Sequence, residues 1–159
     1  MASINSASVK AFFENPLFLA PITSWFLAQL IKAVVVLSGR RRKTMKEVFE
    51  ALAWRTGGMP SSHSALVTSM TTSAAFKEGL DSNVFIISLW FTLIVIRDAM
   101  GVRRASGIQA YVLNLLGKKV AEKTGIEYHP VKEIHGHTPL EVVVGGLLGI
   151  FIAAAYVFL

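Results

Sequence analysis

The sequence contains no cysteine and has few charged residues. Without cysteine there is no disulfide framework and no thiolate metal site. Charged residues make up 16% of the 159 positions and apolar residues 53%, whereas an ordinary soluble domain carries about 25% charge. A P-loop, a Gly-x-Gly-x-x-Gly fingerprint and a Gly-x-Ser-x-Gly elbow are also absent. This composition excludes a disordered chain or a coiled coil and argues against a freely soluble globule.

Four apolar segments are candidates for helices that cross a membrane. The first, residues 17–37, would be about 31 Å long as a helix, which matches a hydrocarbon core of about 30 Å. The fourth, residues 142–159, has no charge, and the third, residues 83–96, is short but apolar on all sides. Hydroxyl side chains dilute the second, residues 61–76, but they can bond to their own helix or a neighbour. We therefore expect one domain over residues 1–159, an all-α integral membrane bundle with about four transmembrane helices.

Positive charge is concentrated in two loops. Of the 16 Lys and Arg residues, thirteen lie in residues 38–59 and 97–141. The positive-inside rule therefore predicts that both loops are cytoplasmic and that both termini lie on the opposite side. A nucleic-acid partner is not expected, because the basic runs flank spans and lack interleaved aromatic residues.

An amphipathic stripe lies within the second basic loop. Ile108, Val112, Leu115 and Leu116 follow helical spacing. The pattern predicts a helix that lies on the membrane surface. Packing of the same stripe against the bundle is an equally good interpretation.

Small residues recur in the last apolar segment. Gly145, Gly149 and Ala153 are four positions apart, so they form a face on which another helix can pack closely. A second copy of the chain is one candidate for that helix, which would make the protein a homo-oligomer.

The strongest local motif runs from Gly57 to Ser64. Pro60 suits the first turn of a helix, and Ser61, Ser62 and His63 follow it. Free N–H groups, hydroxyls and an imidazole at the positive end of a helix dipole bind anions well. Simple serine capping after a glycine-rich turn explains the same residues.

A second motif precedes the last apolar segment. Thr138 and Glu141 have capping-box spacing, and Pro139 falls at the first helical position, so Glu141 has a purely structural explanation. His137 would lie just outside that helix start, where it can face an anion while Glu141 orients its ring. A zinc site built from neighbouring histidines is not expected, because their spacing does not suit one helix face; these are His129, His135 and His137.

Further cations lie near these motifs. Arg103 and Arg104 can fork onto phosphate oxygens, and Asp98 can orient them. Contact with anionic lipid explains the same arginines without a site. Lys32 lies inside the first apolar run, where an ionisable residue suggests a function, unless it extends to the interface.

Taken together and in order, four motifs resemble the divergent branch of the type 2 phosphatidic acid phosphatase superfamily, which is related to vanadium-dependent haloperoxidases. The resemblance spans roughly residue 17 to the C-terminus and includes Gln109 and Asn114. The motifs are Ala28 to Lys32, Gly57 to Ala65, Asp98 to Arg104 and Gly136 to Val142.

The resemblance implies a phosphatase with a phosphohistidine intermediate. His137 would be the nucleophile, Glu141 would orient it, and His63 would be the general acid. Lys32, Arg40, Ser61, Ser62, Arg103 and Arg104 would bind phosphate, with Asp98 orienting the arginines. No metal or other cofactor is expected. The substrate would be a lipid phosphate or isoprenoid phosphate in the bilayer.

The chain departs from the superfamily pattern at several positions. Ser62 replaces a glycine, Glu141 replaces an aspartate, and Val131 falls where the superfamily has an arginine. Lys32 and Arg40 represent the first superfamily motif without its proline. These departures keep open a non-catalytic membrane protein that binds or transports anionic lipids.

Overall fold

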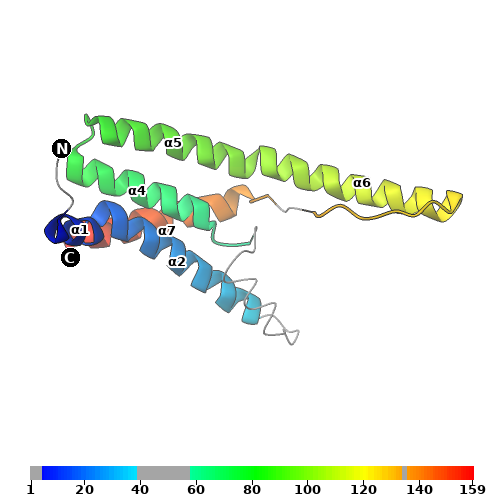
Figure 1. Ribbon diagram of the computed structural model, residues 1–159, viewed down its shortest axis with the longest axis horizontal. Coiled ribbons are helices and arrows are strands. Elements are labelled where there is room, and N and C mark those ends of the chain that lie inside the picture. Colours follow the sequence, from blue (N-terminus) through cyan, green and yellow to red (C-terminus); the bar gives the residue numbers. More distant parts are fainter. Residues whose placement is uncertain (1–4, 39–57, 134–135) are drawn as a thin grey trace.

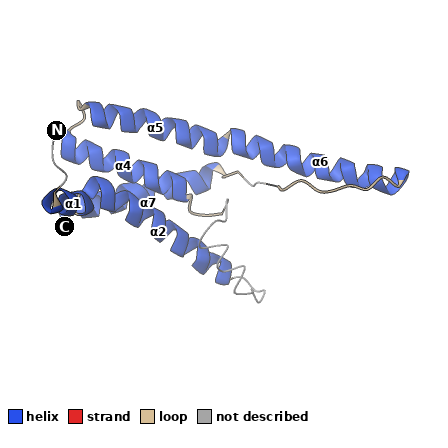
Figure 2. Ribbon diagram, in the orientation of Figure 1, coloured by secondary structure: helices blue, strands red, loops and turns tan. Residues whose placement is uncertain are grey.

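The computed structural model describes residues 5–38, 58–133 and 136–159, and every regular element in these ranges is a helix (Figures 1 and 2). The elements in chain order are α1 (Ser6–Phe13), α2 (Pro16–Leu37), α4 (Ser62–Glu78), α5 (Asn83–Met100), α6 (Val102–Thr124) and α7 (Pro139–Phe158). The all-α architecture expected from the sequence is confirmed. The short helix α1, which apolar periodicity did not indicate, is capped by Asn5.

Three helical stretches are long and apolar enough to cross a membrane: Pro16–Val35, the continuous run Asn83–Thr124, and Pro139–Phe158. The first and last coincide with predicted spans, and the middle one begins where the third was predicted. These helices make the protein an integral membrane protein. The fourth predicted span, α4, has 17 residues and low hydropathy because hydroxyl side chains dilute it, so its crossing stays a prediction.

Helix α4 runs through the middle of the bundle, packed against α2, α5 and α7 (Figure 1). This position explains how its hydroxyls are tolerated in an apolar protein. Thr68 Oγ1 donates to the Gly146 carbonyl of α7 at 3.0 Å, and Thr71 Oγ1 donates to the Ser88 carbonyl of α5 at 3.0 Å. These two threonine hydroxyls therefore bond neighbouring helices, as the sequence suggested.

The glycine face of α7 packs on α4 of the same chain. A Cβ at Gly145 would lie 2.3 Å from the Ser61 carbonyl oxygen, and one at Gly149 would lie 2.2 Å from that of Ala65. The prediction of a close helix contact is thus confirmed, but its interpretation as a homo-oligomer surface is wrong. The absence of side chains lets the α4 backbone occupy this face, which leaves none of it for a second copy.

Helix α6 continues the line of α5 beyond the bundle after an interruption at Gly101 (Figure 1). None of its residues is buried, and Ile108 and Leu116 are among its exposed side chains. The interpretation that its apolar stripe packs on the bundle is therefore wrong. Contact of this stripe with a membrane surface stays a prediction.

Candidate functional site

The site lies at one end of the bundle, where α4 and α7 begin and α5 ends (Figure 1). Helix α1 and the C-terminal end of α7 lie at the other end. Two backbone hydrogen bonds join the helix ends: Ser61 N–H donates to the Glu141 carbonyl at 2.9 Å, and His137 N–H donates to the Ala99 carbonyl at 3.2 Å. Segments far apart in the sequence therefore meet around His137.

His137 and Glu141 form a side-chain pair at the start of α7. Nδ1 of His137 lies 3.0 Å from Oε2 of Glu141, and the His137 side chain is only 6% exposed. The same Oε2 accepts the Thr138 N–H at 3.1 Å, and Thr138 Oγ1 accepts the Glu141 N–H at 3.4 Å. The predicted capping box and the histidine–carboxylate contact thus occur together.

Burial is the main cause that lowers the pKa of His137 below its usual range. The hydrogen bond and charge of Glu141 act against this shift, whereas the charges of Lys32 and Arg103 add to it. The balance favours a neutral imidazole. With Nδ1–H donated to Glu141, the free lone pair of a neutral ring lies on Nε2.

Lys32 is a buried cation beside the start of α4. Its side chain is placed by α2, the residue is 5% exposed, and Nζ donates to Ser62 Oγ at 3.3 Å. An ammonium group has three donors, and Glu141 is the carboxylate whose charge acts on it. Lys32 therefore faces the helix ends that carry the site and is buried inside the protein.

Ser61 is the N-cap of α4. It is fully buried, and its hydroxyl accepts from the Ser64 N–H and from Ser64 Oγ. These contacts correspond to the capping explanation of the motif. The N–H groups of Ser62 and His63 belong to the first turn, where they have no acceptor within the helix itself.

His63 lies in the first turn of α4, close enough to the charges around His137 for them to act on its ring. The residue is exposed, and the groups whose charges act on its ring are Arg103, His137, Lys32 and Asp98. The two histidines that the sequence singled out therefore share one electrostatic environment. Both rings lie at the start of a helix, where the dipole is positive.

Asp98 pairs with Arg103, as Oδ2 lies 2.7 Å from Nε. This contact agrees with the prediction that Asp98 orients an arginine, and its partner is the arginine after Gly101. Arg103 acts on both histidine rings. Arg104 lies on a neighbouring groove, and the predicted phosphate contact of Arg40 falls outside the described residues.

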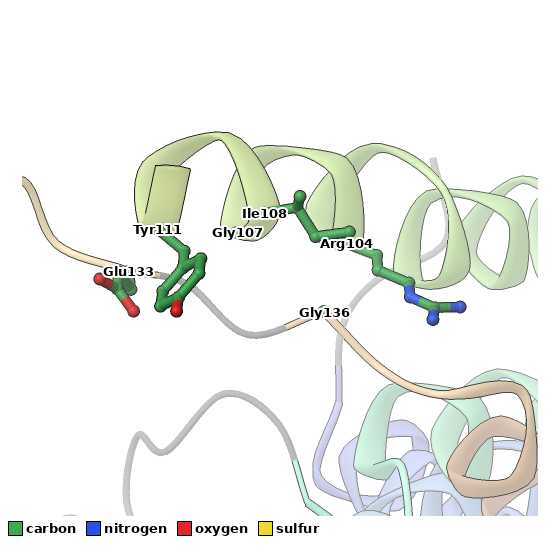
Figure 3. A pocket seen from close by; sticks show the side chains of 6 residues that line it. All are labelled: Arg104, Gly107, Ile108, Tyr111, Glu133 and Gly136. Atoms are coloured by element: carbon green, nitrogen blue, oxygen red, sulfur yellow. The ribbon is translucent and has the colours of Figure 1, made fainter. Parts of the chain in front are cut away.

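A groove lined in part by Gly136, the residue before His137, has a volume of about 310 Å³ (Figure 3). Helix α6 forms one wall and the chain before α7 forms the other; the lining residues are Arg104, Gly107, Ile108, Tyr111, Glu133 and Gly136. Figure 3 shows Tyr111 and Glu133 together at one end, and the Arg104 side chain extending the other way. A Cβ at Gly136 would lie 2.3 Å from the Arg104 backbone nitrogen, so only glycine allows this close approach.

The zinc site at His129, His135 and His137, which the sequence did not favour, can be followed in the structure only in part. His129 is 85% exposed and lies 3.6 Å from Glu127, and His135 falls outside the described residues. Among the ranges that the structure describes, no three His, Asp or Glu side chains are grouped to hold a metal ion.

Asn114 has a role that the sequence did not reveal. It lies on α6, and its side-chain amide binds the segment that leads back to His137. Its position in the resembling motif was the available signal, but the amide gave no indication of its partners because they lie 14 to 19 residues away.

Comparison with known proteins agrees with these motifs. The model of the family described as "Divergent PAP2 family" matches residues 13–152. The chain is also 38% identical over 156 residues to the "Uncharacterized membrane protein YuiD" of Bacillus subtilis (strain 168), with 89% of this chain and 94% of that protein covered. No solved structure matches.

Proposed function

Because the chain belongs to the divergent PAP2 family, we propose that it is a membrane phosphatase that acts on a lipid phosphate or an isoprenoid phosphate. The observation that carries the proposal is the buried His137–Glu141 pair, 3.0 Å apart, at a helix start that lies beside the start of α4. A neutral imidazole held by a carboxylate is an activated nucleophile.

In the proposed reaction, Nε2 of His137 attacks phosphorus and the bond from phosphorus to the ester oxygen breaks. His63 gives its proton to the leaving alcohol. Water then attacks the phosphohistidine, His63 takes a proton from it, and phosphate leaves His137 free. No redox step or co-reactant other than water is needed.

The phosphate would be held by positive charge and helix N–H groups. Lys32 and the hydroxyl of Ser62 lie at the start of α4, whose first-turn N–H groups favour an anion. Phosphoryl transfer depends mainly on positioning and on stabilising negative charge. Arg103 acts on both imidazoles, which supports it as a substitute for the superfamily arginine that is replaced by Val131.

We assign this end of the bundle to the cytoplasmic side. The site end carries Arg97, Arg103 and Arg104 among the described cations, and the positive-inside rule favours the cytoplasm for such loops. A substrate with its apolar part in the bilayer would present its phosphate at this end.

Phosphate release by the purified protein tests the proposal. We expect release from a lipid phosphate in detergent without added metal, and loss of that activity in His63→Ala and in His137→Ala. His129→Ala is the matched control, since this exposed histidine lies outside the site. Full activity in both site variants would contradict the mechanism.

Val131 favours one alternative, a non-catalytic protein that binds anionic lipids in the same cradle. This position is occupied by an arginine in the wider superfamily, and here it is an exposed valine. Lipid binding that survives loss of both histidines, with no turnover in the parent protein, would support the alternative.

A further inference from the structure

The chain between α6 and α7 returns to the bundle alongside α6 without forming a helix or strand in its described parts (Figure 1). Its described residues are 125–133 and 136–138. His137 lies near the end of this segment, so the position of the nucleophile depends on the contacts that hold the segment against α6.

Asn114 makes four hydrogen bonds to this segment with one amide group. Its Oδ1 accepts from Tyr128 Oη at 2.6 Å and from Val131 N–H at 2.9 Å. Its Nδ2 donates to the Val131 carbonyl at 2.9 Å and to Glu133 Oε1 at 2.7 Å. Both amide hydrogens and both lone pairs are used, so no other side chain of similar size can reproduce the set.

Two close approaches fix the same segment on either side of Asn114. A Cβ at Gly117 would lie 2.2 Å from the Tyr128 ring, so the ring packs directly on the α6 backbone. Toward the bundle, the backbone at Gly136 contacts that of Arg104. Glu133, which Asn114 binds, also lines the groove that Gly136 and Arg104 line (Figure 3).

We propose that Asn114 is a positioning residue for His137, which deepens the proposed function and rests on it. The amide fixes Val131 and Glu133, and Glu133 comes four residues before the nucleophile. Lys32 and Ser62, which would hold phosphate, belong to α2 and α4 and do not depend on this segment. Loss of the amide should therefore misplace the nucleophile while leaving the phosphate cradle intact.

The kinetics of five variants test this role. Asn114→Ala should lower kcat by about tenfold or more, because a misplacement of about 1 Å can cost a large factor in rate, while KM changes by less than about twofold. Gln109→Ala is the matched control: Gln109 is an exposed amide of the same helix, and its removal should leave kcat unchanged.

Exchanging the donor and the acceptor of the Asn114–Glu133 hydrogen bond gives a rescue experiment. Asn114→Asp keeps the acceptor for Tyr128 and Val131 but places a carboxylate against that of Glu133, so kcat should fall. Adding Glu133→Gln returns a donor to the pair and should restore much of kcat. Glu133→Gln alone still accepts from Asn114 and should stay near the parent.

A distance measurement tests the same claim without relying on turnover. The chain has no cysteine, so spin labels at Met59→Cys and Lys132→Cys report on the start of α4 and on the segment alone. We expect a narrow distance distribution in the parent and in Gln109→Ala, and a broad or shifted one in Asn114→Ala.

The outcomes separate this role from the proposed function. An unchanged distribution or a parent-like kcat in Asn114→Ala, or a loss of kcat in the double variant equal to that in Asn114→Asp, overturns the positioning role. A lower unfolding temperature with kcat unchanged also overturns it, since that is a structural role only. If the distance distribution broadens in Asn114→Ala but the parent protein releases no phosphate, the proposed phosphatase function is refuted. The attachment of the segment to α6 by Asn114 would then be the part that stands.

Discussion

Oε2 of Glu141 lies 3.0 Å from Nδ1 of His137 while it also accepts the Thr138 N–H at 3.1 Å. One carboxylate oxygen therefore takes part in the capping box of α7 and also contacts the imidazole of His137. The sequence predicted that Glu141 can cap the helix and orient His137 at the same time, and the structure shows one carboxylate oxygen making both contacts.

Glu141→Gln should separate the charge of this residue from its shape. The amide oxygen can still accept the Thr138 N–H, so the unfolding free energy should fall by no more than about 1 kcal/mol. Turnover should fall by about 100-fold or more, because His137 loses the negative charge of Glu141 that supports the ring as a nucleophile. Initial rates of phosphate release and thermal unfolding check both parts.

Glu127→Gln is the control, as this glutamate is 84% exposed and faces His129. Parent-like turnover in Glu141→Gln would show that the carboxylate serves only as a cap.

The pH dependence of turnover follows from the lowered pKa of His137. Burial keeps this ring neutral as the pH falls through about 6.5, so the nucleophile should be lost only at lower pH. His63 must carry a proton to act as an acid, and partial burial lowers its pKa as well, so activity should also fall on the alkaline side of that lowered pKa. The profile of kcat/KM against pH should be bell-shaped, with an acid limb below about pH 6.5.

The same shift has a consequence for stability. Because the folded-state pKa of His137 lies below the unfolded one, the neutral ring supports the fold above about pH 6.5 and this contribution is lost as pH falls. An acid limb that lies above pH 6.5 in the parent would contradict the assignment of His137 as a buried neutral nucleophile.

Alanine substitutions on α7 should distinguish a packed glycine face from a free one. Gly149→Ala places a Cβ 2.2 Å from the Ala65 carbonyl oxygen and should destabilise the bundle by about 1–3 kcal/mol. Gly146→Ala is the control on the same helix, since its nearest neighbour would be Thr68 Cγ2 at 3.5 Å, an ordinary contact. Thermal unfolding in detergent measures the difference.

The two alanine variants should also have the same oligomeric state as the parent. A change of oligomeric state in Gly149→Ala without loss of stability would restore the interpretation of this face as a surface between copies.

Apolar runs predicted the helices well, because burial in a bilayer demands about 20 apolar residues whatever their neighbours. The predicted start and end of the first span differ little from α2, and Thr138 to Glu141 predicted a capping box that is present. The surface that the apolar stripe of α6 contacts was not predictable, because residues such as Ile108 and Val112 suit a lipid surface or a protein surface equally.

The candidate site was predicted as a set of motifs but not as a geometry. Local rules identify a helix start at Ser61 and one at Thr138, and no local rule says that the Glu141 carbonyl accepts the Ser61 N–H. The contacts of Asn114 are likewise long-range in sequence. Such contacts depend on how helices pack, which the sequence pattern does not contain.

Lys32→Met should weaken phosphate binding more than it affects the fold. The hydrogen-bond partner of Lys32 Nζ is the Ser62 hydroxyl, so methionine removes the desolvation cost of a buried charge, and the unfolding temperature should hold or rise. The KM for a lipid phosphate should rise by about tenfold or more, which corresponds to loss of about 1.4 kcal/mol of binding. Lys77→Met, at an exposed position near the far end of α4, is the control.

An unchanged KM in Lys32→Met would show that this lysine serves only the packing of α2 on α4. Inhibition by inorganic phosphate gives a second reading of the same cradle and should weaken in parallel.

Trapping the covalent intermediate tests the central claim most directly. The protein would be mixed with a lipid phosphate labelled in its phosphate group, quenched within one turnover under alkaline conditions that preserve phosphohistidine, and analysed by peptide mass spectrometry. The account predicts one phosphoryl group on His137 in the parent and none in His137→Ala. Phosphate release by the parent with the label on another residue, or with His137→Ala fully active, would contradict it.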